Sequence, residues 1–213
     1  MRKIILFGAS GAIGSAIASE LIRRGHAVTG VSRSGTSTVD GLRMVVGDAS
    51  DAKRVAEVSE GSDVIASAIG PCHDGTDDLQ SLSSIAAALL DGARLAGVRR
   101  LVVVGGAGSL IESDGTRHVD TNHFKPEYRD LAIAHARALH DVFSAAVDLD
   151  WTYVSPAEVI FPGDAVGTYR TENNRLVRNS LGEHQISTDD YAQGFADTIE
   201  NGTYLRQQIN FAY

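Results

Sequence analysis

The sequence has few of the residues that cross-link or stiffen a protein. Its 213 residues include one tryptophan, four prolines and one cysteine, Cys72. A single cysteine excludes an intramolecular disulfide and fits a reducing compartment, so we expect a cytoplasmic protein. No uninterrupted apolar run reaches membrane-spanning length, so neither a transmembrane helix nor a membrane partner is expected. Arg2 and Lys3 precede apolar residues as in a signal peptide, but a glycine turn interrupts the apolar run before it reaches the length of a signal-peptide core. We therefore expect no signal peptide.

The chain also lacks the excess of positive charge with which nucleic-acid-binding proteins contact phosphates. Its formal net charge is -8, which argues against a nucleic-acid partner. With 43% hydrophobic residues, the chain can bury a sizeable core, and we expect one domain over residues 1–213. Nothing in the composition indicates an oligomeric state.

Strand patterns and helix patterns alternate along the chain. Uniformly apolar runs such as 101–104 are typical of parallel strands that are covered on both faces. The alternation predicts an α/β fold, a doubly wound Rossmann-type sheet, mostly parallel and flanked by helices, in strand order 3-2-1-4-5-6 with a further C-terminal strand. The expected strands are 3–7, 27–32, 43–46, 63–67, 100–105, 151–155 and 208–212, and the expected helices are 12–24, 51–59, 78–96, 126–146 and 189–200.

The segment that joins the first strand to the first helix is the most informative one. Gly8, Gly11 and Gly14 are spaced three apart between an apolar run and an amphipathic one. In this arrangement the first glycine permits the turn, the second lets the backbone approach phosphates, and the third lets the helix pack closely on the sheet. The glycines therefore predict a dinucleotide pyrophosphate at the helix N-terminus.

Residues 156–186 interrupt the alternation and are rich in Gly, Asn and Pro. Ligands of open α/β sheets bind beyond the carboxyl ends of the strands, so we favour a substrate-side lid here over a loop without a catalytic role. Arg170, Arg175 and Arg178 could attract an anionic substrate, although we favour a solvated face for them.

The end of the second strand indicates which nicotinamide dinucleotide binds. A carboxylate there would bind a ribose 2′-hydroxyl, but this chain has Ser32 and Arg33, the latter nineteen residues after Gly14. A guanidinium can bind a 2′-phosphate with paired hydrogen bonds, and Ser32 or Ser34 can add another. We therefore expect NADP (NADPH), with NAD as the alternative if Arg33 merely stacks on adenine or faces water. Asp48 is placed to accept from the adenine amino group or to cap the helix over 51–59.

Further motifs follow the glycine turn in an order that is similar to that of a known family. They are Gly47-Asp48, Ser67-Ala68-Ile69-Gly70-Pro71, Val104-Gly105-Gly106-Ala107-Gly108-Ser109, Asp150-Trp151-Thr152-Tyr153-Val154-Ser155-Pro156 and Ile186-Ser187-x-x-Asp190-x-Ala192. Over nearly the whole chain this set resembles the atypical short-chain dehydrogenases/reductases. Among them it most resembles the NAD(P)H-binding NADH-flavin reductase group, which is related to biliverdin-IXβ/flavin reductase and to NmrA-like regulators.

The resemblance implies a place for each part of the cofactor. It puts the pyrophosphate on the glycine turn, the adenosine end near Arg33 and Asp48, and the nicotinamide between 105–109 and 156–159. The residues expected to bind the cofactor are Gly8, Ser10, Gly11, Ala12, Ile13, Gly14, Ser32, Arg33, Asp48, Ala49, Ser67, Ala68, Ile69, Gly105, Gly106, Pro156 and Ala157.

The chain lacks the catalytic pair of the better-known short-chain dehydrogenases, a tyrosine with a lysine four residues later on one helix. Its lysines are Lys3, Lys53 and Lys125, and none follows a tyrosine at that spacing. Tyr128 lies where the pair is sought, but its fourth neighbour is Ala132. Alcohol dehydrogenation through a lysine-assisted phenol is therefore disfavoured.

Three residues are candidates for a catalytic role: Ser109, Tyr128 and Tyr153. Ser109 could hydrogen-bond the acceptor or the carboxamide, and simple capping of its loop is the equal alternative. Tyr128 or Tyr153 could be the acid of an isomerase or reductase in a biosynthetic pathway.

Two other groups of residues are weaker candidates. Residues 72–74 (Cys-His-Asp) follow the fourth strand, but neighbours on a loop rarely point at each other, so nucleophilic catalysis is disfavoured. His118 and His123, like His135 and His140, are five apart, whereas two metal ligands on one helix face are four apart. No metal site is therefore expected.

Together these patterns predict an NAD(P)H-dependent oxidoreductase that transfers hydride to a flavin, a quinone or a similar conjugated small molecule. Such an acceptor delocalises the negative charge, so solvent can supply the proton. The alternative is a non-catalytic NADP-binding redox sensor or regulator of the NmrA-like type, because a missing catalytic pair fits that function equally well.

Overall fold

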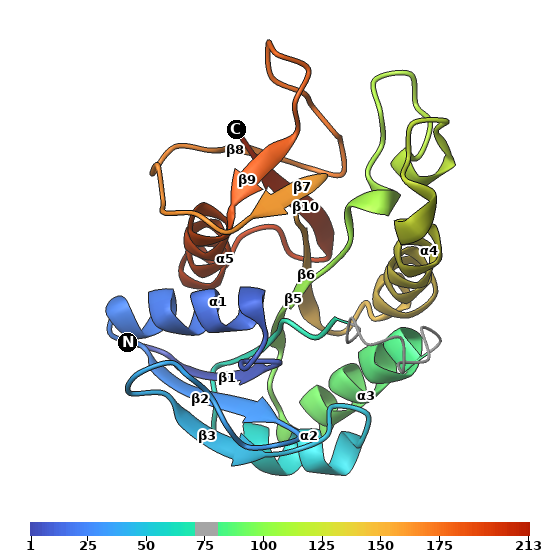
Figure 1. The fold of residues 1–213 in the computed structure, drawn as a ribbon. Helices are drawn as coiled ribbons and strands as arrows, with labels where there is room; N and C mark the ends of the chain where they lie inside the picture. The colour runs from blue at the N-terminus through green and yellow to red at the C-terminus, as the bar shows by residue number, and fades with distance from the viewer. Residues whose placement is uncertain (71–80) are drawn as a thin grey trace.

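A mostly parallel sheet forms the centre of the molecule, with helices on both faces (Figure 1). The computed structural model describes residues 1–70 and 81–213. The eight strands of the main sheet follow the order β3-β2-β1-β4-β5-β6-β10-β8. All neighbours pair in parallel except β8, which pairs antiparallel with β10. The predicted doubly wound order with an added C-terminal strand is confirmed.

The observed elements agree closely with the predicted ones. The main-sheet strands are β1 (Lys3–Phe7), β2 (Ala27–Ser32), β3 (Arg43–Val46), β4 (Val64–Ser67), β5 (Arg100–Val104), β6 (Asp150–Ser155), β8 (Arg170–Glu172) and β10 (Gln207–Ala212). The helices are α1 (Ala12–Arg23), α2 (Ala52–Ser59), α3 (Ser81–Ala96), α4 (Arg129–Arg137) and α5 (Thr188–Asn201). Residues 78–80 of the helix predicted over 78–96 lie outside the described residues. None of the helices in the described part of the chain is long and apolar enough to cross a membrane.

The helix predicted over 126–146 is divided into four pieces. A 3-10 turn over Pro126–Tyr128 leads into α4, which continues as a π-helical segment over Ala138–Val142 and ends in a 3-10 turn over Phe143–Ala145. The hydroxyl of Ser144 donates to the carbonyl of Leu139 at 3.0 Å. A side-chain hydroxyl that competes for a backbone carbonyl loosens regular helix, which explains the irregular end.

Both faces of the sheet are buried, and β1 shows why its sequence is uniformly apolar. Ile4 and Leu6 belong to the core that α1 and α5 cover, whereas Ile5 and Phe7 belong to the core on the α2 and α3 face. Because side chains alternate between the faces of a strand, a strand covered on both sides needs apolar residues throughout.

Residues 156–186, named the lid segment below, are folded onto the sheet and are drawn mainly in orange at the upper left and centre of Figure 1. Near its start, β7 (Val159–Phe161) pairs in parallel with β9 (Gln185–Ser187) to form a second, two-stranded sheet. In its middle, β8 joins the edge of the main sheet.

A buried histidine joins the lid segment to the main sheet. His184 is 2% exposed. Its Nδ1 accepts from the backbone N–H of Glu158 at 3.0 Å, and its Nε2 lies 3.0 Å from Oδ1 of Asn210 on β10. Both contacts suit the neutral ring, with Nε2–H as the donor. Burial lowers the pKa of His184 to about 4.

We expect the free energy of unfolding to fall as the pH is lowered from about 6.5 to about 4. In this window the unfolded chain binds a proton that the folded His184 does not, so its contribution is complete above pH 6.5 and is lost on acidification. The slope that one such group adds is up to about 1.4 kcal/mol per pH unit. Urea denaturation at several pH values should show a flatter dependence for His184→Gln. The exposed His140 offers the control His140→Gln, which should keep the wild-type slope. Equal slopes in all three proteins would contradict the assignment.

Candidate functional site

The turn after β1 has the geometry that its three glycines predict. Gly8 has a φ of +77°, in the left-handed region, and a Cβ there would lie 2.7 Å from the carbonyl oxygen of Ala68. A Cβ on Gly14 would lie 2.1 Å from the carbonyl oxygen of Gly8. By contrast, a Cβ on Gly11 would meet its nearest atom at 3.5 Å, and Gly11 is exposed. Gly8 and Gly14 therefore serve close packing, whereas Gly11 leaves an open surface.

This open surface is the N-terminus of α1. No described side chain caps the helix, and its first turn contains no acidic residue. In comparison, Asp51 caps α2 and Ser187 caps α5 with hydrogen bonds to backbone N–H groups. The uncapped amides and the helix dipole favour an anion here. The cradle at Gly11 therefore fits a dinucleotide pyrophosphate, and Ser10, Ala12 and Ile13 lie in the same turn.

The predicted adenosine-binding residues lie together where β2 and β3 end side by side. Ser32 pairs with Val46 at this edge. Asp48 accepts from the backbone N–H of Ser50 at 2.9 Å and from its hydroxyl at 2.8 Å. These bonds, together with the charge of Arg33, lower the pKa of Asp48. Asp48 thus stays ionised near Arg33, and the cap of α2 is Asp51 rather than Asp48.

The residues after β4 lie against the glycine turn. The N–H of Ala68 donates to the carbonyl of Phe7 at 2.8 Å, and the carbonyl of Ala68 is the atom that faces Gly8. Ser67 is buried, with Ile69 two residues beyond it. Ala49, on the loop after β3, is also buried. Residues 72–74 lie outside the described residues.

The glycines after β5 are explained by packing. A Cβ on Gly105 would lie 1.9 Å from the ring of Tyr153, and a Cβ on Gly106 would lie 2.8 Å from Cβ of His135 on α4. The hydroxyl of Ser155, at the end of β6, donates to the carbonyl of Gly106 at 2.8 Å. This loop and the neighbouring Pro156 and Ala157 are therefore fixed beside each other at the ends of β5 and β6, where the nicotinamide is expected.

The structure does not bring the three candidate catalytic residues together. Ser109 is buried, and its hydroxyl accepts from the Gln208 side chain at 2.7 Å, so it anchors its loop. Tyr128 is 52% exposed on the turn before α4. The hydroxyl of Tyr153 is buried and donates to the carbonyl of His135 at 3.0 Å. Burial raises the pKa of Tyr153, so this side chain does not suit a proton donor to substrate.

We expect Tyr153→Phe to lower stability and leave turnover unchanged. Its hydroxyl bonds only within the core, so its loss costs about 1 kcal/mol of unfolding free energy, and kcat with any acceptor stays within about twofold. Urea denaturation and steady-state kinetics on the same preparation test this, with Tyr128→Phe as the surface control. A tenfold loss of kcat at unchanged stability would restore Tyr153 as an acid.

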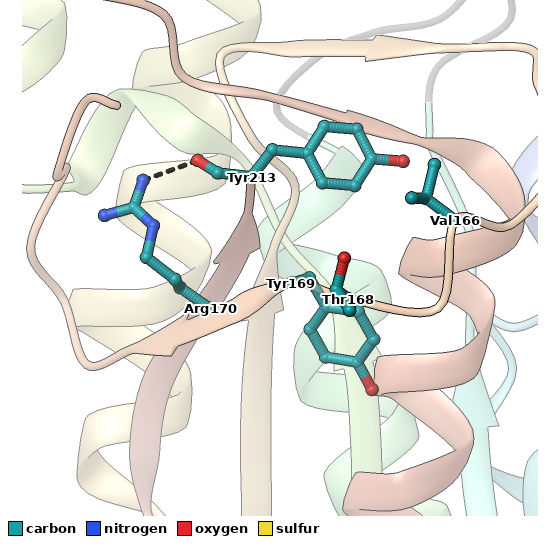
Figure 2. Close-up of a pocket in the computed structure, with 5 residues that line it drawn as sticks. All are labelled: Val166, Thr168, Tyr169, Arg170 and Tyr213. Carbon is teal, nitrogen blue, oxygen red and sulfur yellow. Dashed lines mark hydrogen bonds between the residues drawn. The ribbon is translucent and has the colours of Figure 1, made fainter. Parts of the chain in front are cut away.

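The cavities in the described part of the chain include a small one beside the expected nicotinamide site and a larger one at the edge of the sheet. The smaller, about 30 Å³, lies between the ends of β4 and β5 and the helices α3 and α4, with Ser67, His135 and Tyr153 in its wall. The larger, about 490 Å³, lies at the far edge of the sheet and is lined by Val166, Thr168, Tyr169, Arg170 and Tyr213 (Figure 2). None of the residues predicted to bind the cofactor lines the larger one.

A cluster that the sequence did not predict joins the loop after β5 to the lid segment. One oxygen of Glu112, Oε1, lies 2.8 Å from Nδ1 of His118, 3.1 Å from Nε2 of His123 and 3.2 Å from Nη2 of Arg178. Arg178 also donates to Glu158 at 2.5 Å. Burial raises the pKa of Glu112, but the bonds from the two histidines and the charge of Arg178 outweigh it, so the pKa is lowered.

The requirement that two metal ligands be four residues apart applies to ligands on one α-helix. His118 and His123 are not on one α-helix, so their spacing of five does not exclude a shared metal ion. His118 begins a 3-10 turn (His118–Asp120), and His123 lies in the loop that follows. Only the folded loop brings both rings to Glu112. The sequence signal that could have revealed it is the density of His and acidic residues between 112 and 123.

The similarity to known proteins extends over all or nearly all of the chain. The uncharacterized protein YwnB of Bacillus subtilis is 33% identical over 210 residues, which are 97% of this chain and 96% of YwnB. The crystal structure of a "putative exported protein" from Burkholderia pseudomallei is 44% identical, with a TM-score of 0.91 and full coverage of both chains. That of SP1627, a "putative NADH-flavin reductase" from Streptococcus pneumoniae, is 31% identical, with a TM-score of 0.87 over 100% of this chain and 99% of SP1627.

The match to a family model agrees with the geometry of the site. The model of a family described as NAD(P)H-binding matches residues 8–202, from the first glycine of the turn to the end of α5. Since this match covers most of the sequence, and the glycine turn fits a pyrophosphate, the chain belongs to this NAD(P)H-binding family, whose members resemble atypical short-chain dehydrogenases.

Proposed function

We infer that the protein is a reductase that prefers NADPH and passes its hydride to a flavin, a quinone or a similar conjugated acceptor. The observation that carries the choice of acceptor is the lack of a tyrosine–lysine pair: the Tyr153 hydroxyl is hydrogen-bonded in the core, Tyr128 lies on the surface, and no lysine follows either at four residues. An acceptor that delocalises charge needs alignment more than it needs a protein acid.

In this proposal the residues of the chain bind and orient. The uncapped amides of α1 and the open backbone at Gly11 hold the pyrophosphate. Arg33 binds the 2′-phosphate, and Asp48 accepts from adenine. The loop 105–109 and residues 156–159 flank the nicotinamide, and the lid segment covers the acceptor. When bound, NADPH supplies the hydride.

The name of SP1627 as an NADH-flavin reductase supports an acceptor of this class, since the two chains are 31% identical over nearly their full lengths. The alternative, a nucleotide-binding regulator without turnover, shares the same binding residues. The two functions differ in whether bound NADPH is consumed.

One fluorescence experiment distinguishes them. NADPH is mixed with the protein, and FMN and then menadione are added. A reductase gives enhanced NADPH emission that decays only after an acceptor arrives, and the acceptor that starts the decay identifies its class. Emission that persists through both additions contradicts this proposal and favours the sensor. A mixture without protein corrects for reduction that occurs without the enzyme, and Gly11→Ala, which we expect to fold but to bind NADPH more weakly, should show less enhanced emission at the same NADPH concentration.

A further inference from the structure

We propose that Glu112, His118 and His123 form a binding site for a divalent transition metal ion, with zinc as its best match. Two imidazole nitrogens and one carboxylate oxygen are the donors that zinc takes in three-ligand protein sites. The three ligand atoms lie within 4.8 Å of one another. This site is separate from the dinucleotide-binding turn, and its existence does not depend on the proposed reaction.

Two of the three distances between the donors are close to those of a zinc site, and the third, between the two histidine nitrogens, is no more than 4.8 Å. Ligands about 2.1 Å from a tetrahedral zinc ion lie about 3.4 Å from each other. Oε1 of Glu112 lies 2.8 Å from Nδ1 of His118 and 3.1 Å from Nε2 of His123. Opening the two Glu112 contacts by roughly half an ångström, together with an adjustment of the separation between the histidine nitrogens, would therefore admit the ion, and both changes are within the reach of side-chain rotations.

The ring of His118 is already held in the orientation of a ligand. The residue is buried, and its ring packs against the edge of Phe124, with ring centroids 5.0 Å apart. Its Nδ1 faces Glu112, and its Nε2 lies 3.8 Å from Oε1 of Glu158. A carboxylate beside the second ring nitrogen is the usual outer partner of a metal-binding histidine, because it fixes the tautomer and the ring.

Arg178 contacts two of the proposed ligand atoms, so its guanidinium competes with a metal ion for them. Its Nη2 lies 3.2 Å from Oε1 of Glu112 and 3.4 Å from Nε2 of His123, and so supplies positive charge to both. Its Nη1 is bound to Glu158. An incoming cation would repel the guanidinium and take over Glu112, while Arg178 keeps its contact with Glu158. Metal binding would thus break the ion pair between Arg178 of the lid segment and Glu112 of the loop after β5.

The three protein ligands leave one tetrahedral position open. The side chain of His123 is 57% exposed, whereas those of Glu112 and His118 are largely buried. The fourth position therefore lies toward solvent and would take water or a small anionic or thiol ligand.

Isothermal titration of Zn²⁺ into the full-length, untagged and chelator-treated protein tests the site. We expect one equivalent to bind, and Co²⁺ to give the visible absorption of a tetrahedral complex. His123→Asn should weaken Zn²⁺ binding at least tenfold and still fold, since this side chain is exposed. His140→Asn removes an exposed histidine outside the cluster and should leave binding unchanged. Equal Zn²⁺ affinity of the wild type and His123→Asn, or no saturable binding up to about 1 mM, would overturn the proposal.

A second variant tests the competition. Arg178→Gln removes the positive charge and keeps a polar side chain that can still reach Glu158, so Zn²⁺ should bind more tightly than to the wild type. Weaker binding in Arg178→Gln would show that the guanidinium holds the ligands in place instead, and would overturn the exchange described here. Both readouts are independent of enzyme activity.

Discussion

Gly14→Ala is expected to abolish dinucleotide binding and to destabilise the fold. The added Cβ would lie 2.1 Å from the carbonyl oxygen of Gly8, 2.9 Å from its carbonyl carbon and 3.1 Å from Cα of Ala9. All three are backbone atoms, so no side-chain rotation can relieve the contact and α1 must move away from the turn. Overpacking of this kind costs about 1–3 kcal/mol, and the displaced amides should lower NADPH affinity by about 100-fold or more.

Gly11→Ala provides the matched comparison. Its Cβ would meet its nearest atom at 3.5 Å, an ordinary contact, so the unfolding free energy should stay within about 1 kcal/mol of the wild type. The methyl group nevertheless projects where the backbone must approach a phosphate, and we expect NADPH to bind about tenfold more weakly. Fluorescence titration with NADPH and urea denaturation measure the two effects separately. Unchanged affinity in Gly11→Ala would show that the pyrophosphate does not lie on this turn.

Arg33→Gln is expected to raise KM for NADPH by about 10-fold to 100-fold while KM for NADH stays within about threefold. Charge-assisted hydrogen bonds to a phosphate contribute about 1.5–3 kcal/mol, and each 1.4 kcal/mol is a factor of ten. NADH has no 2′-phosphate and should lose little. The charge of Arg33 also lowers the pKa of Asp48, so the two groups lie near each other.

Arg43→Gln is the control for this prediction. Arg43 is another exposed arginine, and it lies at the opposite end of the neighbouring strand, β3. Its replacement changes the net charge equally but should alter neither KM. Steady-state kinetics with NADPH and with NADH give the two KM values for each variant and for the wild type. Equal losses for NADPH and NADH in Arg33→Gln would contradict the assignment of Arg33 to the phosphate.

The features that sequence predicted well are those with a local cause. Apolar runs predicted the positions of the strands from β1 to β6. The spacing of Gly8, Gly11 and Gly14 predicted a tight turn, and the contacts that a Cβ would make at Gly8 and Gly14 show why glycine is needed there. The pairing of β7 with β9 was not predicted, since strands of three residues carry too little periodicity and depend on partners far away in the chain.

The candidate site was harder to predict for a related reason. Tyr153 lies in a strand that the sequence predicted correctly, but a parallel strand buried on both faces gives no sign of where a hydroxyl group points. The Glu112 cluster was missed because its contacts join residues up to 66 positions apart, Glu112 with Arg178. No helical or strand period relates such residues, and only the folded loop brings them together.

The pairing of β8 with β10 determines how the lid segment can move. Residues 170–172 form ladder pairs with 210–212, and the buried side-chain amide of Asn210 donates to the carbonyls of Glu172, Asn173 and Arg175. A hinge-like opening of the whole segment would have to break these bonds and expose the edge of β10. This part of the segment therefore belongs to the same cooperative unit as the sheet, and those of its backbone amides that point toward β10 should exchange with solvent as slowly as those of the main sheet rather than as fast as those of a surface loop.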